Sequence, residues 1–210
     1  MTILLSLDGK PSTQTKYRPL KEKRRCGTSA SLAKTLKDLQ DRKMSFFVNL
    51  VYTEKNLKDL FENVAFLVKK GVRDIQLTYA IGSKLKEKDA LSVHKILKKI
   101  FQTFPQVNFF GCYGENEPIL ATPQITVDSN GDIYRGCALV LEKNYPDFNG
   151  LCRVGTLDNI TNFSVLQKTI NEQTGFLLDS QHNIPLRLMN NLYFGLALKK
   201  SLSLPEENSR

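Results

Sequence analysis

Apolar residues follow two different periods along the first half of the chain. Short continuous apolar runs are typical of buried strands, and they alternate here with stretches in which apolar residues recur every three or four positions, as on amphipathic helices. The predicted strands are residues 3–7, 45–51, 74–78 and 107–110. One predicted helix is capped by Thr28 or Ser29, a second is capped by Thr53, and a third spans residues 87–101. Gly71 suits a left-handed cap at the end of the second helix.

This alternation of strands and helices with short connections predicts an α/β fold. Its strands are expected to be parallel and linked by crossover helices. Ligands of such folds bind beyond the carboxyl ends of the strands. The polar residues at those ends are Ser6, Asp8, Asn49, Tyr52, Gln76 and Thr78. They are candidates for a binding site, although turns and helix caps use the same residue types.

The beginning of the chain carries two further expectations. Residues 3–7 form an apolar run typical of a central strand with neighbours on both sides, but the run begins at residue 3, so we expect one edge of this strand to be bare in this chain. Residues 10–27 are polar and basic without periodicity, so we expect a loop.

A β-hairpin is predicted after the strand–helix region. Residues 124–127 and 132–134 are short β-type runs, and Asp128-Ser129-Asn130-Gly131 lies between them. Asn-Gly between two such runs predicts an antiparallel hairpin. Residues 163–170 and 186–198 are predicted helices, and the second, apolar on most faces, is expected to dock on the rest of the protein. Residues 201–210 are polar and expected to be disordered.

Composition and charge narrow the classes of function. The chain has 210 residues, of which 41% are hydrophobic, which is enough for one domain with a core, and no apolar run reaches the length of a membrane span. The first residues lack the features of a signal peptide, so we expect a cytoplasmic protein with reduced or metal-bound cysteines. The net charge of +9 is spread along the chain, and aromatic residues are not interleaved with its densest run, residues 21–25. Nucleic-acid binding is therefore disfavoured.

Three of the four cysteines bracket the predicted hairpin. Cys112 precedes it, Cys137 follows its second run, and Cys152 comes 15 residues later, whereas Cys26 lies in the basic segment. Thiolates delivered by a hairpin and its flanking loops can converge on a metal ion or an iron–sulfur cluster. The alternative is that they are buried apolar residues, because free cysteine is among the most buried residue types and no Cys-x-x-Cys pair is present.

Several segments together resemble radical SAM enzymes. Residues 5–9, Leu-Ser-Leu-Asp-Gly, followed by Arg18, resemble the middle of that family's barrel, and residues 49–56 and 71–77 resemble its next strand-to-helix turn and strand. The hairpin region is similar to the start of a SPASM or twitch domain, which holds auxiliary iron–sulfur clusters. The positions that carry this second similarity are Cys112, Gly131, Cys137 and residues 154–157.

The resemblance implies a fold, a set of domains and a set of ligands. It implies a partial (β/α) barrel with parallel strands over residues 1–111, a SPASM/twitch-like β-hairpin region over 112–165, and C-terminal helices with a polar tail over 166–210. Ser6 and Asp8 would lie near the ribose of S-adenosyl-L-methionine (SAM), and Asn49 and Gln76 near its adenine or methionine. An auxiliary [4Fe–4S] cluster would be ligated by Cys112, Cys137 and Cys152. A role in modifying or maturing a peptide or protein is typical of SPASM-type relatives, and no catalytic residue is identified.

One departure from the family changes the expected activity. The Cys-x3-Cys-x2-Cys motif that binds the SAM-cleaving cluster is absent from these 210 residues. We therefore expect the C-terminal portion of a radical SAM protein, from a truncated, split or decayed gene, that is inactive by itself. The alternative is a non-catalytic binding module that pairs with a partner chain, for example one supplying the N-terminal half of the barrel.

Overall fold

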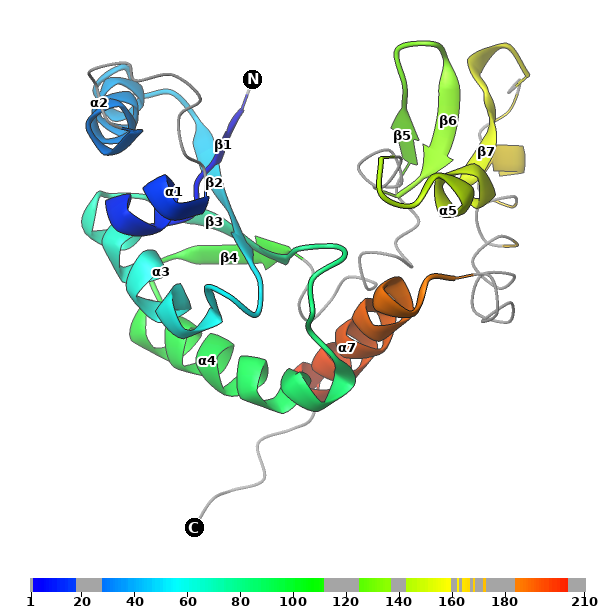
Figure 1. The fold of residues 1–210 in the computed structure, drawn as a ribbon. Helices are drawn as coiled ribbons and strands as arrows, with labels where there is room; N and C mark the ends of the chain where they lie inside the picture. The colour runs from blue at the N-terminus through cyan, green and yellow to red at the C-terminus, as the bar shows by residue number, and fades with distance from the viewer. Residues whose placement is uncertain are drawn as a thin grey trace.

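The computed structural model describes residues 2–17, 28–111, 125–136, 143–159, 162, 164–166, 168, 172 and 184–203. Its larger sheet has four parallel strands in the order β1-β2-β3-β4. These strands are β1 (Ile3–Ser6), β2 (Phe46–Tyr52), β3 (Asp74–Tyr79) and β4 (Asn108–Gly111). The predicted α/β fold with parallel strands is therefore confirmed (Figure 1).

Helices cover one face of this sheet and build the main core. They are α2 (Thr28–Asp41), α3 (Leu60–Lys69) and α4 (Ala90–Thr103), with the short 3₁₀ helices η1 (Leu57–Asp59) and η2 (Glu87–Asp89) before the last two. On β2, Val48, Leu50 and Tyr52 are buried against them, and the intervening residues point to the opposite face and are half-buried. This alternation follows from the two-residue side-chain period of a strand.

The C-terminus of α3 has the glycine cap that the sequence predicts. Gly71 has φ +81°, and its N–H donates to the carbonyl of Val68 at 2.9 Å. The N–H of Val72 donates to the carbonyl of Leu67 at 3.1 Å, which completes a Schellman motif. The start of the helix differs from the prediction, because Thr53 caps no helix. Thr53 belongs to a turn in which Asn56 Oδ1 accepts its N–H at 2.7 Å.

One expectation for the beginning of the chain was wrong. The described part of the segment predicted as a loop contains α1 (Pro11–Tyr17). Asn63 of α3 holds this helix, because its Oδ1 accepts bonds from Thr13 Oγ1 at 3.0 Å and from the N–H of Lys10 at 3.1 Å.

The strand β1 lies at the edge of the described sheet, where β2 is its one described neighbour. Leu4 is 51% exposed. The apolar first strand therefore has one bare edge within the described residues, as the sequence predicts.

A second, three-stranded antiparallel sheet contains the predicted hairpin. Its strands are β5 (Ile125–Val127), β6 (Asp132–Arg135) and β7 (Arg153–Thr156). Gly131 has φ +86°, and the N–H of Asp128 donates to the carbonyl of Asp132 at 2.8 Å to close the turn. The strand β7 and the helix α5 (Pro146–Leu151) were not predicted. Of the helix predicted over 163–170, the described residues 164–166 and 168 are helical.

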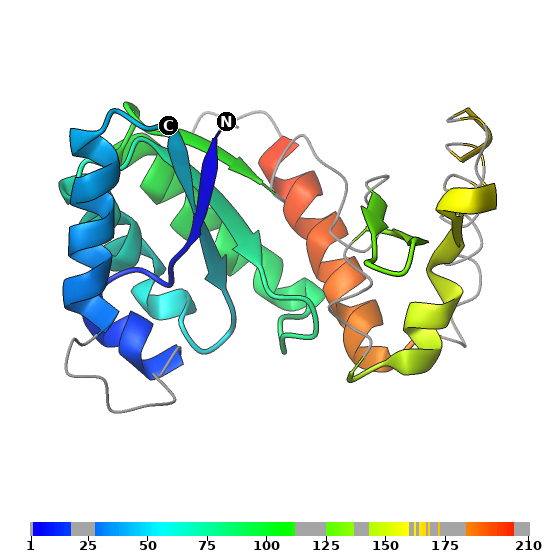
Figure 2. The ribbon, with the colours of Figure 1, turned by 90° about the horizontal axis from the view of Figure 1, so that it is seen from above.

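The helix α7 (Leu186–Ser203) connects the two sheets, as Figure 2 shows. Its Phe194 packs edge-to-face on Tyr79 of β3, with ring centroids 5.1 Å apart, and Leu198 joins the same core. At the other end, Leu188 and Leu192 pack with Phe148 and other residues beside the small sheet. The predicted docking of this helix is therefore confirmed. No helix in the described part of the chain has the length and apolarity needed to cross a membrane.

Candidate cofactor-binding face and cysteine region

Three of the four predicted cofactor-binding residues lie side by side on the face of the large sheet opposite α3 and α4. Ser6 of β1 is in register with Asn49 of β2, and Asn49 is in register with Gln76 of β3. Phe110 of β4 completes this row beside Gln76. Neighbouring parallel strands lie about 4.8 Å apart, so one small molecule can reach several members of the row. We call Ser6, Asn49 and Gln76 the polar row, and Phe110 lies at its end.

Buried neighbours hold the polar row in place. Asn49 lies between Val48 and Leu50, and Gln76 lies between Ile75 and Leu77, all four of which are fully buried on the helix-covered face. The amide side chains therefore project to the opposite face, where both residues are half-buried. A hydrogen bond of 3.2 Å from Thr78 Oγ1 to Asn49 Oδ1 orients the Asn49 amide. The Nδ2 group is then the part of this amide that can donate to a ligand.

Asp8, the fourth predicted residue, lies beyond the carboxyl end of β1 and not in the row. It is only 5% exposed, and its N–H donates to Gln14 Oε1 of α1 at 2.7 Å. The next residue, Gly9, has φ +110°, and a Cβ there would collide with the side chain of Asn63. The segment after β1 is thus held against α1 and α3, which places Asp8 at the end of the strand that carries Ser6.

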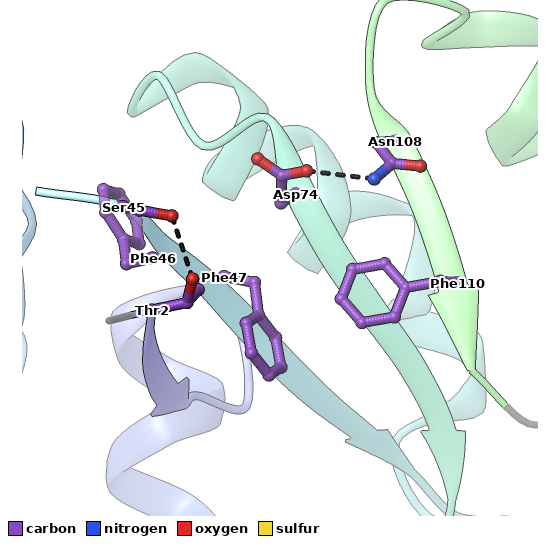
Figure 3. A pocket seen from close by; sticks show the side chains of 7 residues that line it. All are labelled: Thr2, Ser45, Phe46, Phe47, Asp74, Asn108 and Phe110. Atoms are coloured by element: carbon purple, nitrogen blue, oxygen red, sulfur yellow. Dashed lines mark hydrogen bonds between the residues drawn. The ribbon is translucent and has the colours of Figure 1, made fainter.

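A cavity of about 340 Å³ opens on the same face, towards the amino ends of the strands (Figure 3). Its lining consists of Thr2, Ser45, Phe46, Phe47, Asp74, Asn108 and Phe110. Phe47 and Phe110 contact each other edge-to-face with ring centroids 5.2 Å apart, and Asn108 Nδ2 donates to Asp74 Oδ1 at 3.0 Å. Phe110 lines this cavity and also lies beside Gln76 at the end of the polar row. Sequence reasoning missed the cavity because its residues come from the starts of several strands.

Phe110 is followed along β4 by a glycine that the sheet requires. Gly111 has φ +131°, and a Cβ at this position would lie 2.4 Å from the carbonyl oxygen of Leu77 on β3. A side chain at this position would therefore push β4 away from β3. The signal for this close approach in the sequence is a glycine directly after an apolar run.

Of the predicted metal ligands, only Cys152 is among the described residues; Cys112 and Cys137 lie outside them, as do Cys26 and Arg18. Cys152 follows α5, is 4% exposed and packs with Phe148 and Leu188. This burial raises the pKa of the Cys152 thiol to about 11, although the charge of Arg135 opposes the rise. Within the described residues, no group of three His, Cys, Asp or Glu side chains could hold a metal ion.

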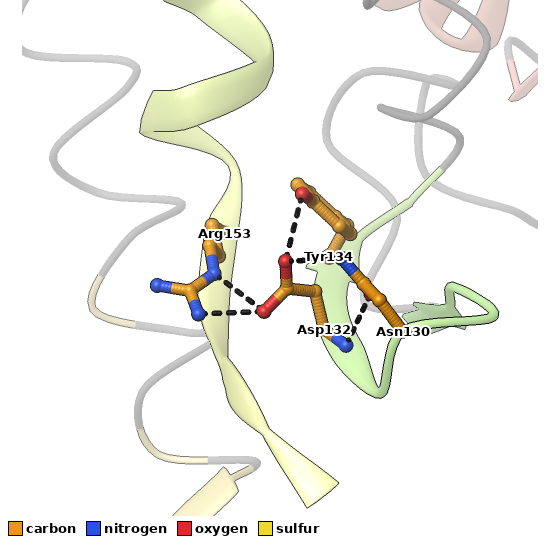
Figure 4. A network of polar contacts seen from close by, with 4 residues as sticks. All are labelled: Asn130, Asp132, Tyr134 and Arg153. Carbon is orange, nitrogen blue, oxygen red and sulfur yellow. Dashed lines mark hydrogen bonds and ion pairs between the residues drawn. The ribbon is translucent and has the colours of Figure 1, made fainter.

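The two arginines of the small sheet have different environments. Arg153 of β7 donates from Nε and Nη2 to Asp132 Oδ1 at 2.9 and 2.5 Å, and Asn130 and Tyr134 also bond Asp132 (Figure 4). Arg135 of β6 is 3% exposed, and its Nε and Nη2 have no hydrogen-bond partner among the described residues. Burial lowers the pKa of the Arg135 guanidinium, and a deprotonated Cys152 would oppose this change.

Solved structures with a similar fold exist, although the sequence matches no family model and no curated protein. One shows native anSMEcpe with bound AdoMet, at 18% identity and a TM-score of 0.56, over 89% of this chain and 53% of that chain. Another shows native anSMEcpe with bound AdoMet and the Cp18Cys peptide, at 16% identity and a TM-score of 0.58, over 94% of this chain and 58% of that chain. The chain thus spans about half the length of these structures.

These structures are of a sulfatase-maturating radical SAM enzyme of the SPASM type. The comparison confirms the predicted resemblance at the level of the fold. The protein has the α/β fold of a partial (β/α) barrel, followed by a β-hairpin region and a C-terminal helix.

Proposed function

We propose that this chain is the SAM-binding and auxiliary-cluster portion of a cytoplasmic radical SAM protein that modifies a peptide. The observation that carries this proposal is the register of Ser6, Asn49 and Gln76 on one face of a parallel sheet. A hydroxyl and two primary amides offer both donors and acceptors within a short distance. The two similar structures contain bound AdoMet, and one of them also contains the Cp18Cys peptide.

The donor set of the polar row fits the adenosyl part of SAM. Adenine offers ring-nitrogen acceptors and an amino donor, which primary amides such as those of Asn49 and Gln76 can pair with in two places. Ser6, with Asp8 at the end of the same strand, would bond the ribose hydroxyls. Phe110 adds an aromatic ring beside Gln76 for apolar contact with the base.

In this proposal the residues of the chain bind, orient and shield SAM. SAM would supply radical chemistry, hydrogen abstraction from the substrate, in the whole protein, and the residues of this chain would supply its orientation and the exclusion of water. The half-buried position of the Asn49 and Gln76 amides suits this role, because they can contact a ligand on a face that has an apolar layer beneath it.

We assign the remaining segments by the same proposal. Residues 1–111 form the partial barrel, residues 112–165 the SPASM/twitch-like region, and residues 166–210 the C-terminal helices and tail. Cys112, Cys137 and Cys152 would hold a [4Fe–4S] cluster that supplies electron transfer. The unpaired N–H groups of the buried Arg135, whose charge acts on Cys152, are an arrangement that fits an anionic centre at this place.

Because the 210 residues contain no Cys-x3-Cys-x2-Cys motif, we propose that the chain by itself binds SAM without cleaving it. A second function, pairing with a partner chain, is favoured by one observation. Within the described sheet, the edge of β1 that faces away from β2 has no neighbouring strand. An unpaired strand edge can accept a strand from another chain, such as one that supplies the N-terminal half of the barrel.

Photo-crosslinking locates the proposed SAM site. Ultraviolet irradiation of the chain with radiolabelled SAM, followed by proteolysis and mass spectrometry, should label peptides that contain β2, β3 or β4. Excess unlabelled SAM should abolish the label. Labelling confined to α7 or to the outer helices, or no labelling that SAM competes for, would overturn the proposal. Formation of 5′-deoxyadenosine by the reduced, reconstituted chain would overturn the claim that it does not cleave SAM.

A further inference from the structure

The cavity beside the polar row has a single ionisable group among its described lining residues, the carboxylate of Asp74 (Figure 3). The rest of that lining consists of phenylalanine, threonine, serine and asparagine side chains. The volume of about 340 Å³ falls within the range of small-ligand pockets, which is about 300–1,000 Å³. An anionic ligand would meet the negative charge of Asp74, so the lining favours a ligand with a positive charge.

Asp74 has one carboxylate oxygen available for such a ligand. Its Oδ1 accepts the bond from Asn108 Nδ2 at 3.0 Å, and Asn108 is in register with it on the neighbouring strand, which fixes the orientation of the carboxylate. Its Oδ2 accepts no hydrogen bond and joins no ion pair within the part of the chain that the structure describes. The side chain is half-buried, so solvent screens its charge less than that of a fully exposed carboxylate.

Two aromatic rings line the same cavity. Phe47 and Phe110 pack edge-to-face with ring centroids 5.2 Å apart, and both are half-buried on the sheet face opposite α3 and α4. The face of an aromatic ring attracts a cation that lies within about 6 Å of the ring centre. Aromatic rings and a carboxylate in one cavity therefore suit an organic cation, because the rings contact its apolar part and the carboxylate compensates its charge.

The strands relate this cavity to the polar row. On β2, Phe47 precedes Asn49 by two residues, and on β3, Asp74 precedes Gln76 by two residues. Side chains two positions apart on a strand point to the same face and lie about 6.6 Å apart along it. A ligand held by Asn49 and Gln76 therefore has Asp74 within reach of the next part of its structure.

We propose that this cavity binds a positively charged organic group, with the charge at Asp74 and the apolar part of the ligand against Phe47 and Phe110. Two sources offer this chemistry. One is SAM held on the polar row, through its positive sulfonium, and this source rests on the proposed function. The other is a separate small amine with an apolar body, which needs no SAM.

The first arm of the test compares SAM with S-adenosylhomocysteine (SAH), which differs in having a neutral sulfur without the methyl group. Calorimetric titration of the full chain measures both affinities. If SAM is the source, wild type should bind SAM about fivefold more tightly than SAH, as for an ion pair near a protein surface. Asp74→Asn keeps the shape of the side chain and should abolish this preference. Asp38→Asn, the control, removes an exposed carboxylate on α2 and should retain it.

The second arm compares phenethylamine with phenethyl alcohol, which share a ring and a short chain and differ in charge. If a separate amine is the source, wild type should bind the amine about fivefold more tightly than the alcohol in NMR titrations, and Asp74→Asn should bind both equally. The net charge of +9 repels cations in general, so a preference for the amine points to a local carboxylate.

A second variant and an unfolding measurement guard against a folding artefact. Phe47→Leu keeps an apolar side chain and removes the ring, so it should reduce the preference for the charged ligand about two- to fivefold. Thermal unfolding shows whether each variant keeps its fold.

Loss of either preference in folded Asp74→Asn supports the cavity site and identifies its source. Equal binding of the charged and neutral ligands by wild type in both arms would show that the cavity is no cation site. A preference that folded Asp74→Asn and Phe47→Leu both retain would show the same. A chain that binds neither SAM nor SAH and still prefers phenethylamine in an Asp74-dependent manner would overturn the proposed function and leave the cavity site standing.

Discussion

Thr78 Oγ1 donates a hydrogen bond of 3.2 Å to Oδ1 of Asn49 on the neighbouring strand. Because the Asn49 carbonyl oxygen is engaged, its Nδ2 is the group that can donate to a ligand. Replacing Thr78 with valine keeps the shape and removes the donor. The amide can then rotate, and a hydrogen bond of this kind contributes about 1 kcal/mol.

We therefore expect Thr78→Val to weaken SAM binding roughly fivefold, which corresponds to that energy. Calorimetric titration measures the affinity, and circular dichroism checks that the fold is retained. Thr103→Val is the control, because Thr103 Oγ1 bonds a carbonyl at the end of α4, on the helix-covered side. Equal affinity of Thr78→Val and wild type would show that the orientation of Asn49 does not matter for binding.

Asn191 joins α7 to the segment after β3. Its Oδ1 accepts the N–H of Gly82 at 2.7 Å, and its Nδ2 donates to the carbonyls of Ser83 and Leu85, each at 3.1 Å. Asn191 is fully buried, so Asn191→Ala leaves buried donors and acceptors unpaired. We expect the free energy of unfolding to fall by about 2–4 kcal/mol, since each unpaired buried group costs about 1–3 kcal/mol. Denaturant unfolding of Asn191→Ala against the half-buried neighbour Asn190→Ala tests this, and equal midpoints would contradict it.

We expect replacement by alanine to have opposite effects on stability at Gly111 and at Gly150. At Gly111 an added Cβ would lie 2.4 Å from the Leu77 carbonyl oxygen at φ +131°, whereas nothing lies within 4 Å at Gly150 in α5. Gly111→Ala should lower the free energy of unfolding by about 1–3 kcal/mol, as backbone strain does. Gly150→Ala should be neutral or stabilising by up to about 1 kcal/mol, because alanine favours helix. Thermal unfolding of both variants decides, and a Gly111→Ala protein as stable as wild type would mean that β4 does not approach β3 so closely.

The ion pair of Asp132 with Arg153 predicts a dependence of stability on pH. The hydrogen bonds from Arg153 and Asn130, together with the charge of Arg153, hold the pKa of the Asp132 carboxyl below its usual value of 3.8. The contribution of the pair is therefore complete above pH 3.8 and lost as the pH falls through the lower pKa of the folded protein. Asp132→Asn should be less stable than wild type at neutral pH, and the difference should shrink in strongly acidic buffer. Urea midpoints at both pH values measure this, and a difference that does not change with pH would refute it.

Much of the larger sheet is predictable from local patterns in the sequence. The apolar runs predict the strands. Val48 and Leu50 flank Asn49, and Ile75 and Leu77 flank Gln76, so the two-residue side-chain period of a strand places both amides on the face opposite these buried residues. The register of Ser6 with Asn49 follows from the parallel order of the strands.

Features that depend on distant residues could not be predicted. The helix α1 forms where polar composition predicts a loop, because Asn63 bonds it from 50 positions away at Thr13. The contact of α7 with the segment after β3 depends on Asn191, which is 109 positions from Gly82. The pairing of β6 with β7, a strand that was not predicted, brings Arg135 next to Cys152, whose carbonyl accepts the Arg135 N–H. No sequence pattern marks an arginine that will be buried without a partner.

Calorimetric titration of the chain with SAM tests the central claim most directly. We expect saturable binding to wild type and to Gln102→Ala, which removes an exposed amide on α4. The double variant Asn49→Ala/Gln76→Ala should bind at least tenfold more weakly, because it removes two polar contacts of about 1 kcal/mol each or more. No binding of SAM to wild type, or equal binding by wild type and the folded double variant, would contradict the account.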